Sequence, residues 1–181
     1  MRTTSRRRCP ESNRSRPSEP RGEKMLPSDE LEKAKSYGDI FALVKKAVKR
    51  SLGEHRVGLM LYLGNLPMKV GAFHPMGTND IVLNRRLLNA AARTEPAWKA
   101  YVFTILLHEY IHSLGYADER QVRGLTYRVC VDNFGRDHPV VEAAITGPWV
   151  NLSPEAFESI GDDMDLERVR DFERIDSNYI I

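Results

Sequence analysis

Several common features are scarce in this 181-residue chain, and their scarcity limits what the protein can be. It has two cysteines: Cys9 lies in a segment with almost no apolar residues, and Cys130 lies in a segment that we expect to be helical. We therefore expect no structural disulfide. We expect a reducing, cytoplasmic setting. The longest apolar run, residues 101–107, is far too short to cross a bilayer. No apolar stretch follows the basic N-terminus as in a signal peptide, so we expect no membrane association.

Acidic residues are few at the start of the chain. Residues 1–27 hold eight of the 27 Lys and Arg but only three of the 25 Asp and Glu, which leaves 19 basic and 22 acidic residues for the remainder. Because this first segment is also poor in apolar residues, we expect a disordered basic tail at 1–27 and a single domain at 28–181. The tail is either a solvated extension or a tether that recruits nucleic acid.

Histidine is also scarce, with five residues, yet two of them belong to one motif. His108-Glu109-Tyr110-Ile111-His112 reads H-E-x-x-H. Residues four apart lie on one face of an α-helix, so both imidazoles can bind one Zn²⁺. Glu109 falls at the rim of that face, within reach of a water molecule at the metal. This pattern is typical of a metal-assisted hydrolase in which the carboxylate is the general base.

The motif lies near the end of a segment with strong helical signals. Thr94 is a candidate N-cap, and Pro96 is placed early, where its missing N–H costs nothing. Residues 97–114 contain neither Gly nor Pro, and Gly115 follows where a left-handed C-cap is expected. Apolar residues fall on both sides of this helix, so we expect both sides to be buried. Two His and one Glu in such a helix are costly unless something satisfies them, which favours a metal site over a pair of core histidines.

The third metal ligand is ambiguous on the residues alone. After His112 neither His nor Cys occurs before Cys130, so the nearby candidates are Asp118 and Glu119. The short connector is long enough to double back to the metal from either position.

On these residues the segment resembles the zincin metallopeptidases, in two ways. Read as H-E-x-x-H-x-x-G-x-x-D, it resembles the metzincins, with Gly115 at the turn and Asp118 as the third ligand, as in snapalysin-like enzymes. Against this, the only methionine downstream that could form a Met-turn is Met164, in an acidic stretch. Read the other way, it is similar to the gluzincins, and most similar to the small single-domain minigluzincins. That resemblance implies Glu119 as third ligand, followed by the stripe Val122, Leu125, Thr126.

The two interpretations give Asp118 different roles. In the gluzincin interpretation Asp118 and Gln121 form a capping pair at the start of a helix, which leaves Glu119 for the metal. We favour this interpretation, with Asp118 kept as the alternative ligand.

The rest of the chain predicts an α+β domain. Strands are expected at 56–63, 70–73 and 80–84, as a small mixed sheet. Helices are expected from 28, at 40–52, 85–92, 119–133, 139–146, 154–160 and 165–175. The zincin resemblance implies that residues 80–84 form an edge strand beside the central H-E-x-x-H helix, where an extended peptide would pair with it.

The predicted function is zinc-dependent hydrolysis of peptide bonds in a peptide or protein substrate. Zn²⁺ would be bound by His108, His112 and Glu119, with Glu109 as general base. Candidates for the donor that stabilises the oxyanion are Tyr116, Arg123, Tyr127 and His138. Two alternatives belong to other classes: a non-catalytic zincin-fold binding module, and a nucleic-acid-associated protein recruited by the basic tail.

Overall fold

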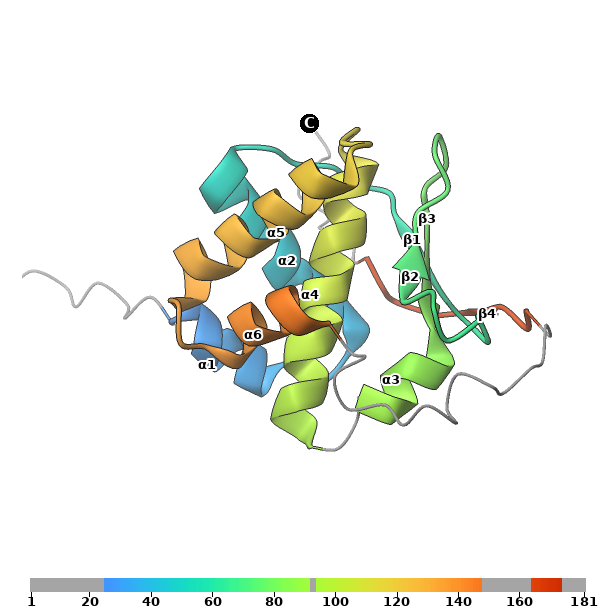
Figure 1. Cartoon of the computed structure of the whole chain (residues 1–181), viewed down its shortest axis with the longest axis horizontal. Coiled ribbons are helices and arrows are strands. Elements are labelled where there is room, and N and C mark those ends of the chain that lie inside the picture. Colours follow the sequence, from blue (N-terminus) through green and yellow to red (C-terminus); the bar gives the residue numbers. More distant parts are fainter. Residues whose placement is uncertain (1–24, 92–93, 148–163, 174–181) are drawn as a thin grey trace, which may run out of the picture.

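The computed structural model describes residues 25–91, 94–147 and 164–173. These residues form an α+β structure with a small four-stranded mixed sheet and a mostly helical remainder (Figure 1). Its elements, in chain order, are α1 (Pro27–Lys33), α2 (Tyr37–Leu52), β1 (Met60–Gly64), β2 (Ala72–Phe73), β3 (Asp80–Asn84), α3 (Arg85–Ala91), α4 (Glu95–Ser113), α5 (Glu119–Phe134), α6 (Pro139–Thr146) and β4 (Glu167–Arg168).

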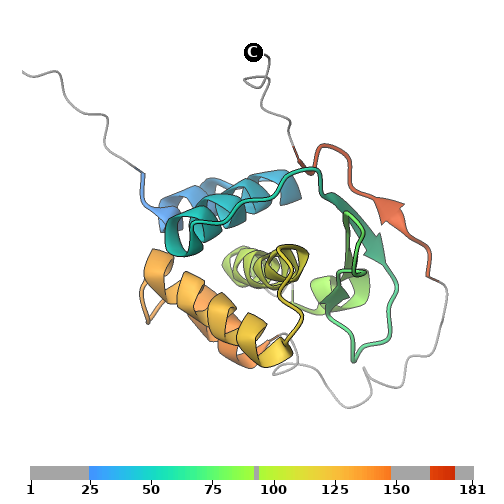
Figure 2. The ribbon, with the colours of Figure 1, turned by 90° about the horizontal axis from the view of Figure 1, so that it is seen from above.

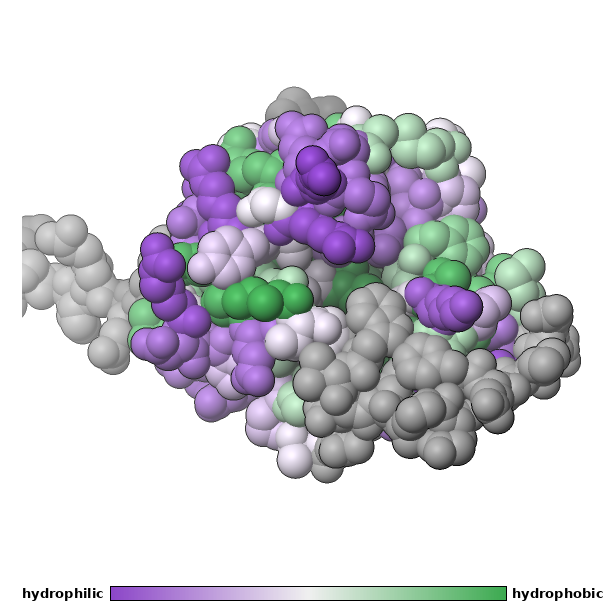
Figure 3. Space-filling model, viewed as in Figure 1, coloured by the Kyte–Doolittle hydropathy of each residue, from purple (hydrophilic) through white to green (hydrophobic). Residues whose placement is uncertain are grey.

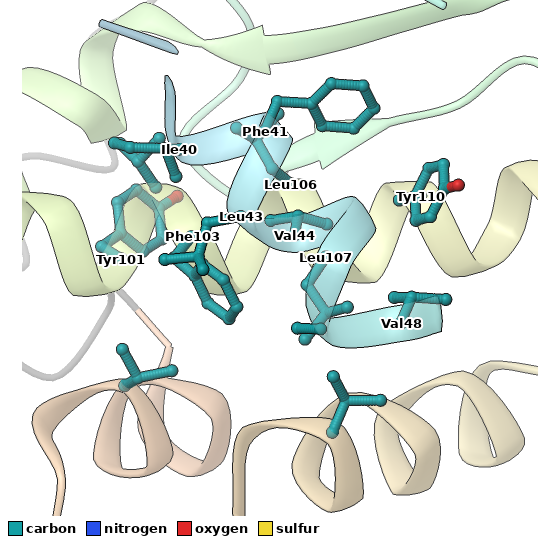
Figure 4. Packing of buried hydrophobic residues seen from close by; sticks show 14 of the residues in the cluster. Ile40, Phe41, Leu43, Val44, Val48, Tyr101, Phe103, Leu106, Leu107 and Tyr110 are labelled. Atoms are coloured by element: carbon teal, nitrogen blue, oxygen red, sulfur yellow. The ribbon is translucent and has the colours of Figure 1, made fainter. Parts of the chain in front are cut away.

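Helix α4 lies in the middle of the molecule. Seen from above, it is enclosed by α1 and α2 on one side, by α5 and α6 on another, and by the sheet on a third (Figure 2). Twelve of its residues are buried, including Phe103, Leu107 and Tyr110 on the side opposite the two His. These side chains pack against α2, where Phe41 and Val44 are fully buried (Figure 4). The prediction that this helix is buried on both sides is confirmed.

The helix ends follow the local signals in the sequence. The Thr94 side chain accepts a hydrogen bond from the backbone N–H of Ala97 and caps α4, as predicted. Helix α2 ends at Gly53, whose φ of 76° places it in the left-handed region that favours glycine. At its other end, Ser36 and Asp39 form a reciprocal capping box. These caps fix where the two helices that carry most of the core begin and end.

The sheet corrects one expectation. Its strand order is β2-β3-β1-β4, with β3 parallel to β1 and antiparallel to β2. Residues 80–84 form a strand with the predicted bounds, but this strand is internal, so the expectation of an edge strand there is wrong. The edge strand on the side of α4 is β2, which is the second half of the strand expected at 70–73. Asn84 supports this edge, because its amide donates to the carbonyls of Leu66, Pro67 and Val70.

The segment after residue 163 corrects a second expectation. A charged helix was expected at 165–175, but Glu167 and Arg168 pair with β1 as strand β4. Phe172 is buried and stacks on Phe41 with ring centroids 4.3 Å apart. Glu173 accepts hydrogen bonds from Lys45 and from the backbone N–H of Leu59. The segment is not helical because pairing with the open edge of β1 and burial of the Phe172 ring favour an extended strand and a turn.

Two other expectations fall outside the described residues. The basic tail at 1–27 lies almost wholly in residues 1–24, and the helix at 154–160 lies between residues 147 and 164. Among the residues that are described, no helix has the length and apolar character needed to cross a membrane.

Replacing Phe172 with Ala should lower the free energy of unfolding by about 3–5 kcal/mol, because it removes a buried ring stacked in the core. Urea denaturation measures the change. Met164→Ala is the matched control, since Met164 is 58 % exposed in the same segment and should have little effect. Equal effects of the two substitutions would show that the C-terminal segment does not pack on α2 as described.

Candidate metal centre

Two helices bring the predicted ligands together. His108 and His112 lie in the last turns of α4, on the same face, with ring centroids 4.9 Å apart. The chain turns at Gly115, whose φ of 104° requires the conformational freedom of glycine. Glu119 is then the first residue of α5. The turn folds α5 back along α4, so the Glu119 carboxylate meets the two imidazoles.

The three side chains form a compact group of potential ligand atoms. One atom from each of His108, His112 and Glu119 lies within 4.8 Å of the others. His108 Nε2 lies 3.5 Å from Glu119 Oε2, and His112 Nε2 lies 3.3 Å from Glu119 Oε1.

These distances fit the donor set of a zinc ion. Ligand atoms bound at about 2.0–2.2 Å at the corners of a tetrahedron lie about 3.3–3.6 Å from one another. The two nitrogen-to-oxygen separations have this length, each to a different oxygen of Glu119, and one donor atom from each residue lies within 4.8 Å of the others. Two imidazoles and one carboxylate are also a common ligand set of catalytic zinc, which leaves a fourth position for water.

His112 is held in the orientation that metal binding needs. Its Nδ1 lies 2.8 Å from the carbonyl oxygen of Tyr116 and donates to it in the neutral ring, so the lone pair is on Nε2. The Tyr116 hydroxyl donates to the Glu54 carboxylate, which ties this turn to the end of α2. The turn after α4 thus carries Tyr116, the residue whose carbonyl orients the ligand His112.

Glu109 is buried beside the ligand group. Its exposed fraction is 5 %, and its carboxylate accepts a hydrogen bond from the backbone N–H of His74, at the end of β2. Burial, assisted by the negative charge of Glu119, raises the pKa of Glu109 to about 8. Without a metal, the carboxyl therefore holds its proton at neutral pH.

His108 and Glu119 have shifted pKa values in directions that suit metal binding. Burial lowers the pKa of His108, although Glu119 acts in the opposite direction. Burial alone would raise the pKa of Glu119, but His108, His112 and Arg123 outweigh it and the pKa is lowered. A neutral imidazole and an ionised carboxylate are the forms that bind metals.

Asp118 is outside this group. Its side chain accepts a hydrogen bond from the backbone N–H of Gln121 at 2.8 Å and caps α5. The predicted capping pair is confirmed. The geometry therefore brings Glu119, and not Asp118, to the two His.

The group opens into a cleft of about 770 Å³ between the helices and the sheet edge. One wall is the segment 69–74, which includes β2, and the opposite wall includes the end of α6, residues 143–147. Tyr101 and Ile105 of α4 also line it. Figure 3 shows this cleft as the hollow in the middle of the face, between α6 and the side of the molecule that carries β2.

Of the four candidate oxyanion donors, only Arg123 lines the cleft. Tyr116 is bonded to Glu54, Tyr127 packs against the core, and His138 caps α6 by accepting from the backbone N–H of Val140. The sequence analysis missed the His74 N–H and the Tyr116 carbonyl. Both are backbone groups, so no residue type could have signalled them.

No protein-family model, no curated protein and no solved structure matches this chain at a significant level. The geometry of the centre is therefore what supports a function.

In the metal-free protein, Glu109→Gln should raise the free energy of unfolding by an amount that grows between about pH 5 and pH 8. The pKa of Glu109 is about 8 in the folded chain, against an ordinary value of 4.5. Its contribution to stability is complete below the ordinary value and is lost as the pH rises through about 8. In that window the free energy of unfolding of the wild type falls by up to about 1.4 kcal/mol per pH unit, and that of the Gln variant does not. Urea denaturation with a chelator measures this.

Glu119→Gln is the matched control for that experiment. Because the pKa of Glu119 is lowered, its ionised form favours folding and the sign of its own contribution is reversed. Loss of its charge removes only the smaller of the two causes that raise the pKa of Glu109, so any gain that grows with pH should be smaller than in Glu109→Gln. A Glu109→Gln variant that is no more stable than the wild type at pH 8 would contradict the buried, protonated carboxyl.

Proposed function

We propose that this protein is a zinc-dependent metallopeptidase of the gluzincin type, in which His108, His112 and Glu119 hold Zn²⁺ and Glu109 is the general base. The observation that carries the proposal is the ligand group itself, in which two imidazole nitrogens and one carboxylate converge to within 4.8 Å, the donor types that catalytic zinc takes. A buried carboxyl directly beside this group supports hydrolysis rather than simple metal binding.

Bound Zn²⁺ supplies Lewis acidity, which polarises a water molecule and the substrate carbonyl, and its charge lowers the pKa of the neighbouring Glu109 carboxyl. The protein's own residues do the remainder. Glu109 accepts a proton from the water molecule as the water oxygen bonds to the carbonyl carbon. The same carboxyl then gives that proton to the amide nitrogen as the C–N bond breaks, which releases a carboxylate and an amine. The His74 N–H keeps the carboxyl directed at the cleft.

The substrate of this proposal is an extended peptide segment. Among the described residues strand β2 pairs only with β3, so its other edge, in the cleft wall, offers backbone groups to a further strand. This role passes from residues 80–84, where the sequence analysis placed it, to Ala72 and Phe73. The side chains of Phe73 and Met76 on one wall and Ile145 on the other are exposed apolar groups for substrate contacts.

A non-catalytic binding module is the less favoured alternative. Burying Glu109 costs stability in the metal-free chain, and a module that only binds zinc has no use for it. The proposal keeps a cytoplasmic setting, which is supported by Cys130 as a free, buried thiol.

Glu109→Gln should keep one zinc per molecule and lose nearly all peptidase activity, because the amide matches the carboxyl in shape but cannot accept the proton of the water. The measurements are metal analysis of the purified protein and cleavage of a peptide library. His108→Ala should lose both zinc and activity and serves as the second arm. A wild-type chain that binds no added zinc at neutral pH would sink the proposal.

Glu119→Ala should weaken zinc binding by more than about tenfold, since even residues that only orient a ligand are worth about 10–100-fold. Asp118→Ala is the neighbouring control. It should cost about 1 kcal/mol of stability through the lost cap and leave zinc affinity unchanged. Zinc titrations and thermal melts of both variants decide the matter. The reverse result would identify Asp118 as the third ligand, as in the metzincin interpretation.

A further inference from the structure

Arg123 lies beside the ligand group, one turn after Glu119 on α5. Its Nε lies 3.5 Å from Glu119 Oε2, the same oxygen that lies 3.5 Å from His108 Nε2. The side chain is 77 % exposed and lines the cleft. Within the described residues this ion pair is its one polar contact, so both Nη groups are available to a ligand.

A fixed positive charge at this place helps to keep Glu119 ionised but opposes the binding of a dication. It is repelled by a dication and competes with it for the Glu119 carboxylate. An exposed ion pair between residues four apart on a helix adds little to stability. The position of Arg123 is better explained by an anionic oxygen that binds in the cleft next to the metal ligands.

Most other side-chain donors of the cleft wall are either engaged or buried. His74 Nδ1 lies 2.8 Å from a backbone carbonyl of β3, so in the neutral ring Nε2 is an acceptor. The hydroxyls of Thr104 and Thr146 donate to carbonyls of their own helices. The hydroxyls of Tyr101 and Thr126 have no hydrogen-bond partner among the described residues, but both are buried and uncharged. Apart from the ligand residues themselves, charged donors remain only on Arg123 and Lys69 among the described lining residues.

Of these two cations, only Arg123 is close to the ligand group. Lys69 lies on the loop before β2 and makes no contact with His108, His112 or Glu119. The planar guanidinium of Arg123 also offers parallel N–H groups, whereas the ammonium of Lys69 is a point charge.

We propose that Arg123 is a catalytic residue that donates to the carbonyl oxygen of the scissile peptide bond as this oxygen gains negative charge. The inference rests on the proposed function. When the water oxygen bonds to the carbonyl carbon, the π electrons of the C=O bond move to its oxygen, and Glu109 takes the proton. Arg123 binds that oxygen most strongly at this point. The negative charge leaves the oxygen again when the carbonyl re-forms and the C–N bond breaks.

Arg123→Ala should lower kcat about 10- to 100-fold and change KM little. Loss of one oxyanion donor from a dry site costs about 10²–10³, and the cleft is more open than that. Zinc affinity, measured by competition with a chelator, should be equal or tighter, because a positive charge beside the site has gone. Arg123→Lys keeps the charge without the planar fork of N–H groups, so its kcat should fall between those of the wild type and Arg123→Ala. A peptide with a phosphinate in place of the scissile amide should bind the Ala variant at least about tenfold more weakly.

Arg120→Ala is the matched control, since Arg120 is exposed on the same turn of α5 and lies outside the cleft lining. Zinc affinity that drops more than tenfold in Arg123→Ala would mean that Arg123 only holds Glu119 in place, and would overturn the inference. A raised KM with unchanged kcat, or a kcat loss confined to Lys69→Ala, would do the same. A zinc-loaded wild type that cleaves no peptide would instead remove the proposed function and this inference with it.

Discussion

The constraint that governs this structure is the placement of ionisable groups in a helix that is buried on nearly every side. Helix α4 supplies much of the hydrophobic core through one face, and the other face carries His108, Glu109 and His112. Each of these groups loses hydration there, which the protein offsets with specific partners. The turn after α4 provides the Tyr116 carbonyl, α5 provides the Glu119 carboxylate, and β2 provides the His74 N–H. The turn after α4, helix α5 and strand β2 must therefore all pack correctly to offset the cost of burying His108, Glu109 and His112.

Anchoring of the end of α4 follows from the same constraint. The Arg56 guanidinium donates to the carbonyls of Ser113 and Thr78, which joins the last turn of the helix to the loop before β3. The Tyr110 hydroxyl bonds to both the N–H and the C=O of Arg56. These contacts fix the helix relative to the sheet edge. Since the cleft lies between the two, its width depends on a residue that touches no part of the candidate centre.

Sequence patterns anticipated the features that local chemistry determines. Thr94 and Gly115 bounded α4, Asp118 and Gln121 marked the start of α5, and i, i+4 spacing placed the two His on one face. Glu119 could be preferred only because Asp118 had another role. The predictions that were wrong concern features that depend on partners distant in the sequence. Whether 80–84 is an edge strand depends on a two-residue strand that pairs with it. Leu166, Val169 and Phe172 are spaced like a helical stripe, yet an open edge of β1 and the ring of Phe41 hold them in a strand and turn.

Charge balance links the stability of the metal-free chain to the proposed chemistry. Without a metal at neutral pH, Glu109 holds its proton, and the charges of Glu119 and Arg123 cancel. In the proposed zinc form Glu109 gives up its proton, so two carboxylates and one guanidinium surround a dication and the centre carries a net charge of about +1. A surplus of that sign favours an oxygen that becomes negative over a neutral carbonyl, which is the selectivity that catalysis requires. Loss of Arg123 would bring the same centre to neutrality, and it would then bind zinc well while discriminating poorly between the ground state and the transition state.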